Sequence, residues 1–228
     1  MQTKIGIGCS TYNRPEVLSL WKEHISKYTL CNPSLITIYI ADDSQERKGI
    51  AFRKNECLKA LQDCDYIFLF DDDCFPIKAG WMNFFIDIHR QTNQHHFLYL
   101  KQSSTIKKTG QNLSTNIYDN CGGCFMFLTK EVLQKVGGFC KDYGVYGYEH
   151  AGYSERIYKA GLNSMGKYLC PEGAGEYIYS MDYDHHLDYH KKINFKPSMI
   201  KEIENIPLYL QSNMQFFHRD IQTIYQPL

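Results

Sequence analysis

The chain has 228 residues, of which 43% are hydrophobic and 22% charged, so its composition is that of a globular protein and not of a disordered one. Lys and Arg number 25, as do Asp and Glu, and this balance excludes a generally basic surface for nucleic acid. No apolar run approaches the roughly 20 residues of a membrane-spanning helix, and the N-terminus has no apolar signal region. We therefore expect a cytoplasmic protein, folded as a single domain over residues 1–228, with no transmembrane segment and no nucleic-acid partner.

The nine cysteines are scattered and follow no export signal, which indicates reduced thiols used mainly for packing. The pair Cys121 and Cys124 has Cys-x-x-Cys spacing, but a structural zinc site would need a second such pair. A redox pair would open a helix, whereas Cys124 leads into an apolar segment typical of a strand. Packing is therefore favoured over zinc binding or redox chemistry.

The first seventy residues alternate between strand and helix patterns. Strands are predicted over residues 5–8, 34–41 and 66–70, and helices from Pro15 and over 50–61. Asn13 is expected to cap the first helix, whose Val17, Leu18 and Trp21 should point inward. The β-branched residues of the second segment indicate a buried strand. Three strands separated by helices predict an α/β fold with a mainly parallel, Rossmann-like central sheet flanked by helices.

The pattern changes after Pro76. Helices are predicted over 81–89, from Thr129 to Gly137, over 149–160 and from Pro197 onward, and strands over 97–100 and 124–128. Residues 101–116 are polar and indicate a loop or a hairpin over the sheet.

Polar residues follow each of the three early strands, at 10–14, 42–44 and 71–73. In parallel sheets these carboxyl ends line one crevice, where ligands bind. Three adjacent aspartates repel one another unless a cation neutralises them, and carboxylate oxygens suit Mg²⁺ or Mn²⁺. The alternative for Asp71, Asp72 and Asp73 is a solvated acidic turn.

Several segments resemble the family-two-like glycosyltransferases of the GT-A fold. They are residues 7–14, 40–44, 53–55, 68–73, 122–126, 136–139 and 146–162, in the order in which the family has them. The resemblance implies a single GT-A-type domain with a nucleotide-sugar-binding half (1–100), an acceptor-side half (101–196) and a C-terminal helical tail (197–228).

The resemblance also implies the residues of the donor site. The nucleotide sugar would contact Thr11, Tyr12, Asn13, Arg14, Asp42, Arg53, Asp71 and Asp72. Asp42 would hydrogen-bond the base, against which Tyr12 would lie, and Arg53 would sit near the base or the diphosphate. Mn²⁺ or Mg²⁺ would be held by Asp71 and Asp73 of the Asp-x-Asp motif and by His186, with His185 and His190 as alternatives.

An inverting transfer needs a base for the proton of the acceptor hydroxyl. The family places this base in a Glu-Asp pair at the start of a late helix, where this sequence has Glu149 and His150. We expect Glu149 to be the base, with His150 as the alternative because its ordinary pKa suits neutral pH. Glu155 is the remaining candidate, and simple helix capping by Glu149 is the structural alternative.

The resemblance implies a metal-dependent glycosyltransferase enzyme that moves a sugar, with inversion, from a UDP-sugar to a hydroxyl of a glycan or other acceptor. A glycosyltransferase-like binding module without catalysis is the main alternative, because the second carboxylate is missing. A sugar nucleotidyltransferase is disfavoured, because residues 5–9 lack the basic continuation of a phosphate loop. The sugar, the acceptor and the oligomeric state are not indicated.

Overall fold

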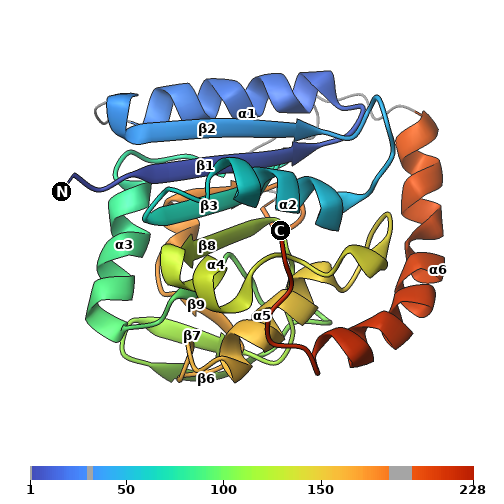
Figure 1. Ribbon diagram of the computed structural model, residues 1–228. Coiled ribbons are helices and arrows are strands. Elements are labelled where there is room, and N and C mark those ends of the chain that lie inside the picture. The colour runs from blue at the N-terminus through green and yellow to red at the C-terminus, as the bar shows by residue number, and fades with distance from the viewer. Residues whose placement is uncertain (1, 30–32, 185–196) are drawn as a thin grey trace.

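The computed structural model describes residues 2–29, 33–184 and 197–228 and is built around a five-stranded sheet (Figure 1). Its order is β2-β1-β3-β8-β5, with bounds β1 (Ile5–Thr11), β2 (Ile36–Asp42), β3 (Tyr66–Asp71), β5 (His96–Leu98) and β8 (Phe125–Thr129). Strands β1, β2 and β3 are parallel, and β8 runs antiparallel to both of its neighbours. The predicted α/β class with a mainly parallel sheet is confirmed.

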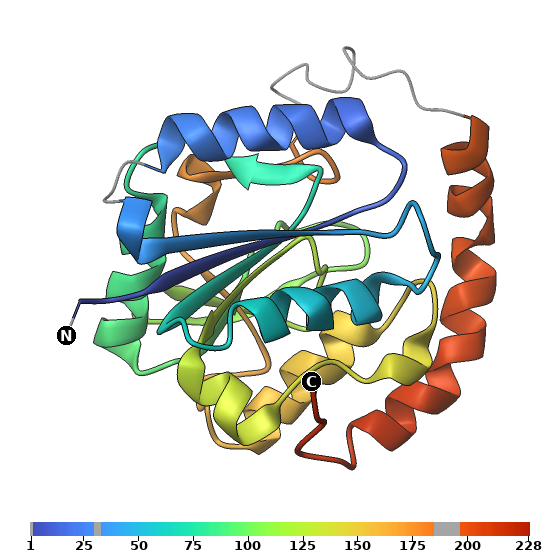
Figure 2. The same ribbon diagram turned by 45° about the horizontal axis from the view of Figure 1, so that its top comes forward.

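Helices cover both faces of this sheet, as Figure 2 shows. They are α1 (Pro15–Tyr28), α2 (Ile50–Ala60), α3 (Trp81–Thr92), α4 (Lys130–Val136) and α5 (Glu149–Lys159). On the α1 and α3 face, Trp21 and Trp81 both pack on Phe70 of β3. The α2, α4 and α5 helices lie on the opposite face.

Two small sheets complete the described fold. One pairs β4 (Cys74–Pro76) with β10 (Ile178–Ser180), and the other joins β6 (Lys108–Asn112), β7 (Thr115–Tyr118) and β9 (Tyr168–Pro171). The predicted loop or hairpin after residue 101 is thus a hairpin. Strands β4, β9 and β10 were not predicted, because segments of three or four residues carry too little periodicity. Short 3₁₀ turns lie at η1 (Pro33–Leu35), η2 (Lys141–Tyr143) and η3 (Ala174–Glu176).

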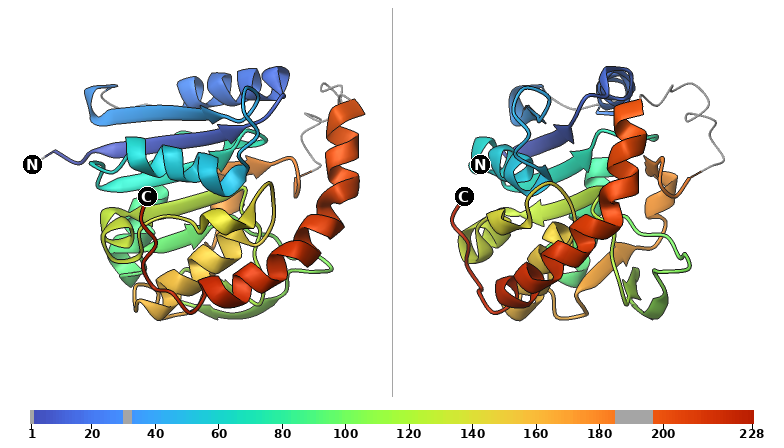
Figure 3. Two further views of the ribbon diagram at one scale, coloured as in Figure 1. Left: turned by 45° about the vertical axis from the view of Figure 1, so that its right-hand side comes forward. Right: turned by 90° about the vertical axis from the view of Figure 1, so that its right-hand side faces the viewer.

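The last helix, α6 (Pro197–Asp220), stands beyond the carboxyl ends of β1 and β2 and runs past α5 (Figure 3). Asn213 fixes it to the segment before α5, since its amide donates to the carbonyl oxygens of Tyr143, Tyr146 and Gly147 at 2.6, 2.8 and 3.1 Å. The predicted C-terminal helix is therefore a support for the loop that leads into α5.

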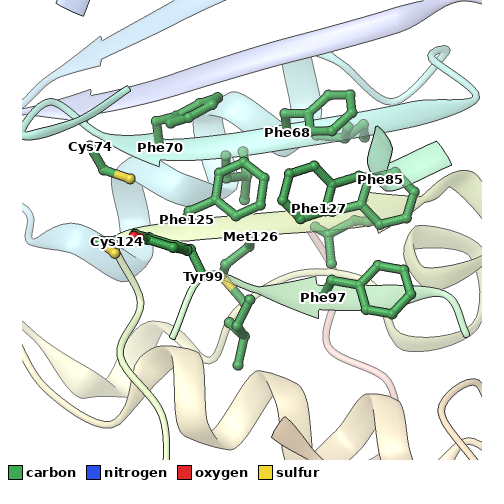
Figure 4. Packing of buried hydrophobic residues seen from close by; sticks show 14 of the residues in the cluster. Phe68, Phe70, Cys74, Phe85, Phe97, Tyr99, Cys124, Phe125, Met126 and Phe127 are labelled. Carbon is green, nitrogen blue, oxygen red and sulfur yellow. The ribbon is translucent and has the colours of Figure 1, made fainter. Parts of the chain in front are cut away.

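The core is strongly aromatic around β3 and β8 (Figure 4). Phe68 of β3 contacts Trp81 and Phe85 of α3 edge-on, with ring centroids 4.8 and 6.3 Å apart. Phe125 and Phe127 of β8 fill the space beside it, at centroid distances of 6.3 and 5.3 Å. Such pairs add to the free energy of area burial and hold the strand that ends in the aspartates.

Two local predictions were wrong. Strand β2 is an edge strand rather than a buried one, and its Ile38 and Tyr39 are 49% and 38% exposed. Its β-branched composition favours a strand but does not distinguish an edge from the centre of a sheet. Helix α1 has Arg14 at its N-cap without a side-chain cap bond, and Asn13 lies one residue earlier, in the left-handed turn with φ 51°. Pro15 opens the helix as expected.

Eight cysteines lie in the described ranges; all are buried and none is in a disulfide, which agrees with packing. No helix in the described ranges has both the length and the apolar content that crossing a membrane would require.

Candidate active site

The carboxyl ends of β1, β2 and β3 meet at one edge of the sheet, as expected. In the register, Thr11 of β1 lies opposite Asp42 of β2, and Ser10 of β1 lies opposite Asp71 of β3. Side chains join the same ends, since the Ser10 hydroxyl donates to Asp71 Oδ1 at 2.9 Å.

Asp72 is an internal anchor of this edge. Its side chain is fully buried, accepts a 2.6 Å hydrogen bond from the Thr11 hydroxyl, and forms a two-nitrogen ion pair with Arg14. Burial raises the pKa of Asp72 to about 7, against the opposing charge of Arg14. The nucleotide contacts of Thr11 and Asp72 stay predictions, and in the structure each of these side chains is enclosed and hydrogen-bonded to the other.

Asp71 and Asp73 flank this anchor and remain partly exposed, at 20% and 15% of their side-chain surface. Arg14 Nη1 donates to Asp73 at 2.7 Å, so Arg14 is held against the aspartates. A third carboxylate, Asp182, follows β10; the charge of Asp73, together with desolvation and the charge of Asp71, raises the pKa of Asp182 to about 7. Mutual repulsion of this kind marks a place that a cation would stabilise.

The residues fit a divalent cation. Carboxylate oxygens are the ligands that Mg²⁺ and Mn²⁺ prefer, and such ions usually complete their shell with water and substrate phosphates. Within the described part of the chain, no three His, Cys, Asp or Glu side chains are placed to hold a metal by themselves. A shell completed by a diphosphate is consistent with this arrangement. His185, His186 and His190 lie outside the described residues.

Two neighbouring aspartates at the end of β2 differ in burial. Asp42 is exposed and accepts hydrogen bonds from the backbone N–H and the hydroxyl of Ser44. Asp43 is 2% exposed and binds Arg53 Nε and Arg47 Nη1, each at 2.7 Å. Bonds from two backbone N–H groups and these arginines outweigh burial and hold the pKa of Asp43 below its ordinary value.

Arg53 is engaged by groups of the protein itself. Besides Asp43, its guanidinium donates to Glu56 at 2.7 Å and to the carbonyl oxygen of Glu46, and only 8% of the residue is exposed. These bonds occupy the groups that a nucleotide would need, so Arg53 supports the 43–49 loop. The Arg53 contact with the base or diphosphate stays a prediction, and it would require the guanidinium to give up one of these bonds.

Tyr12 and Asn13 form the turn between β1 and α1. The Arg47 guanidinium lies over the Tyr12 ring, 3.6 Å from its centroid, in a cation–π contact. The Asn13 N–H donates to the Ser44 hydroxyl at 2.9 Å, which ties this turn to the loop that follows Asp42. Tyr12 and Asp42 are thus on neighbouring turns, as the predicted base site requires.

Lys54 is the functional candidate that sequence reasoning missed. It is 1% exposed, donates to the Gly123 carbonyl oxygen at 2.9 Å, and lies 3.4 Å from Asp71 and 3.7 Å from Glu149. A lysine inside an otherwise apolar helix face was the available signal, because lysines are rarely buried without a charged partner. It links the donor-side aspartates to the start of α5.

Glu149 and His150 form an ion pair at the start of α5. His150 Nδ1 lies 3.0 Å from Glu149 Oε1, and Glu149 Oε2 accepts from the Gly147 N–H at 3.1 Å. Burial raises the pKa of Glu149, but His150 and Lys54 outweigh it and bring that pKa to about 2. Burial lowers the pKa of His150, but Glu149 outweighs it and holds that pKa well above the ordinary value. Each group therefore favours the charged form of the other.

A cavity of about 430 Å³ lies beside this pair. Its walls include Asp71, Asp182, Glu149, His150, Ser103, Asn120, Tyr146, Tyr148, Tyr183 and Leu210. Two glycines let side chains of the cavity wall pack directly on the backbone. A Cβ on Gly122 would lie 1.9 Å from the Tyr183 hydroxyl, and a Cβ on Gly123 would lie 2.6 Å from the His150 ring. Tyrosine rings beside small polar groups are suited to binding a sugar.

No family model matches the chain. Among curated proteins it is similar to an uncharacterized glycosyltransferase of Acanthamoeba polyphaga mimivirus, with 34% identity over 123 residues. This match covers 50% of the chain and 48% of the relative, so the chain spans about half of the relative's length.

Solved structures with a similar fold include a mannosyltransferase and a galactosyltransferase. The mannosyltransferase PcManGT of Pyrobaculum calidifontis, in complex with GDP-Man and Mn²⁺, superposes with a TM-score of 0.59 at 12% identity, covering 76% of this chain and 56% of that one. The Drosophila β-1,4-galactosyltransferase 7, in complex with manganese, UDP-Gal and xylobiose, gives 0.52 at 18% identity, covering 87% and 79%. TarS of S. aureus gives 0.56 at 11% identity, covering 78% and 36%. The chain has the GT-A fold, which confirms the fold implied by its sequence resemblance.

Proposed function

We propose that the chain is an inverting glycosyltransferase that uses a divalent cation to transfer a sugar from a UDP-sugar to a hydroxyl group of a glycan. The observation that supports this most directly is the placement of Asp71. This residue belongs to the acidic end of β3, lines the 430 Å³ cavity and is linked through Lys54 to Glu149. A donor bound on the aspartates would therefore present its sugar to an acceptor in that cavity.

On the donor side, Asp42 is the proposed base ligand. Its carboxylate is exposed at the end of β2, while its neighbour Asp43 is enclosed by arginines. Tyr12 would lie against the base, and Asn13 and Arg14 would border the nucleotide from the end of β1. Asp42 and Tyr12 are held near each other by the Ser44 contact with Asn13.

Asp73 and Asp71 would hold the divalent cation, with Asp182 as a further carboxylate that feels the charge of both. When bound, the cation acts as a Lewis acid that stabilises the negative charge developing on the leaving diphosphate. Arg14, held on Asp72 and Asp73, keeps this edge in place without the cation. The two solved structures with Mn²⁺ and a nucleotide sugar support this proposal at the level of the fold.

On the acceptor side, the cavity would hold a sugar against Tyr146, Tyr148 or Tyr183. The hydroxyl that attacks needs a proton acceptor on the face opposite the diphosphate, and the Glu149–His150 pair lines that cavity. A binding module without catalysis would not need a charged pair in this place. The pair therefore favours an enzyme over that alternative.

The test is a thermal unfolding screen of UDP, UDP-glucose, UDP-galactose, UDP-N-acetylglucosamine and GDP-mannose, each with and without Mn²⁺. A ligand at a hundred times its dissociation constant adds about 2.7 kcal/mol of stability. We expect this gain for uridine compounds only when Mn²⁺ is present. Release of UDP from a stabilising sugar nucleotide in the absence of acceptor would separate an enzyme from a binding module. Stabilisation by none of the five would contradict the proposal.

A further inference from the structure

Both oxygens of the Glu149 carboxylate are engaged by groups of the protein. Oε2 accepts from the Gly147 N–H at 3.1 Å, and Oε1 lies 3.0 Å from His150 Nδ1 and 3.7 Å from Lys54 Nζ. The residue is 1% exposed. An acceptor hydroxyl would have to displace one of these partners to reach it.

His150 is placed differently. Its side chain is 14% exposed and lines the cavity, so an acceptor in that cavity reaches it first. The ring is fixed on two sides, because Glu149 holds Nδ1 and the backbone of Gly123 lies against the ring where a Cβ would come within 2.6 Å of Cγ. Glu149 engages Nδ1, and the ring also has a side-chain hydrogen bond with Cys121, a weak sulfur partner that an acceptor hydroxyl at Nε2 would have to replace or share.

We propose that His150 is the general base of the transfer and that Glu149 is its positioning residue, an assignment that rests on the proposed function. As the acceptor oxygen attacks the anomeric carbon, its proton moves to His150 Nε2. The new carbon–oxygen bond forms while the bond from the anomeric carbon to the diphosphate oxygen breaks, and that electron pair leaves with the UDP. The imidazolium produced is paired with the Glu149 carboxylate until it releases its proton to water.

The charges around the ring set the pH dependence of this step. Glu149 from α5 and the thiol of Cys121 contact the ring, Lys54 of α2 lies behind Glu149, and the phenol of Tyr146 lies near the same carboxylate. Because Glu149 raises the pKa of His150, the neutral base form accumulates only above pH 6.5. Transfer should therefore rise with pH through a pKa above 6.5, whereas a carboxylate base with the pKa of Glu149, about 2, would give no such rise.

The experiment compares His150→Ala, Glu149→Gln and the surface control His218→Asn, whose side chain is exposed at the end of α6. The donor probes are UDP-galactose, UDP-glucose and UDP-N-acetylglucosamine with Mn²⁺, and the acceptors are xylobiose and water. General-base catalysis is typically worth about 10²–10⁴-fold, so His150→Ala should lose about that much in kcat and recover part of it when imidazole is added. Glu149→Gln should keep the rise with pH but move its midpoint down toward 6.5, and His218→Asn should match the wild type.

Three results would overturn the assignment. One is a His150→Ala protein with near-wild-type turnover, and a second is a wild-type pH profile without a rise above pH 6.5. Loss of turnover without imidazole rescue would also count against it, provided that His150→Asn, which keeps more of the side-chain volume, melts like the wild type and fails equally. Failure of the proposed function would look different, because the wild type would then neither bind UDP nor release it from any donor.

Discussion

The ammonium group of Lys54 lies 3.7 Å from the carboxylate of Glu149, although α2 and α5 are far apart in the sequence. The same group lies 3.4 Å from Asp71 Oδ1, so one buried cation separates a donor-side carboxylate from an acceptor-side carboxylate. Each carboxylate alone would be expensive to bury, and the lysine makes their approach favourable. The two halves of the site are thus joined through the protein's interior before any substrate binds.

Removing this cation should destabilise the protein. Lys54→Met removes the cation that lies between Asp71 and Glu149, and loss of one partner from a buried ion pair costs about 3–5 kcal/mol. Lys59→Met is the matched control, because Lys59 is exposed in the last turn of the same helix. Urea unfolding at neutral pH measures both free energies. Equal stability of the two variants would show that Lys54 does not balance these charges.

Replacing Asp42 or Asp43 by alanine should affect different properties of the protein. Asp42→Ala should leave the free energy of unfolding nearly unchanged but raise KM for the donor with little change in kcat, as lost uniform binding does. Asp43→Ala should instead lower the stability by about 3 kcal/mol or more, because Arg53 loses a buried partner. Steady-state kinetics and urea unfolding on both variants separate the roles. A fall in kcat alone for Asp42→Ala would exclude base binding.

The Glu149–His150 pair should make stability depend on pH in two directions. The pKa of Glu149 is lowered from 4.5 to about 2, so its contribution is complete above pH 4.5 and is lost as the pH falls toward 2. The pKa of His150 is raised above 6.5, so its contribution is complete below pH 6.5 and is lost as the pH rises through the folded-state value. The stability difference between wild type and Glu149→Gln, measured by urea unfolding, should be largest between pH 4.5 and 6.5. A difference that does not vary with pH would contradict the pairing.

Gly123→Ala tests whether the orientation of the His150 ring matters. The added Cβ would lie 2.6 Å from ring atoms, so the ring must move away from its contact with Glu149. Transfer should fall by at least tenfold while UDP affinity is kept. Gly110→Ala is the control, because its Cβ would meet Ile117 at an ordinary 3.6 Å. Unchanged kcat in Gly123→Ala, with both proteins folded, would remove the requirement for a fixed ring.

Much of the fold could be predicted because its signals are local. The apolar strand before Asp71, the helix opened by Pro15 and the order of strands and helices all follow from periodicity and turn residues. The position of β2 at the edge could not be predicted, because the strand order depends on which neighbours pair and not on the strand's own composition.

The sequence predicted where the candidate site residues lie in the fold, but not which residues they contact. The sequence placed Asp42, Asp71 and Glu149 at the right ends of their elements, since chain order determines which ends meet. It did not show that Arg53 would pair with Asp43, or that Lys54 would turn inward toward Gly123. Those contacts depend on the angle at which α2 packs on the sheet, which no local pattern encodes.

The central claim is that a divalent cation on the aspartates at the end of β3 is needed to bind a uridine diphosphate. Titration calorimetry of UDP into the wild type and Asp73→Asn, each with Mn²⁺ and then with EDTA, tests it most directly. We predict clear binding only for the wild type with Mn²⁺, because without the cation Asp71 and Asp73 repel the diphosphate. Undiminished UDP affinity in EDTA would contradict the account.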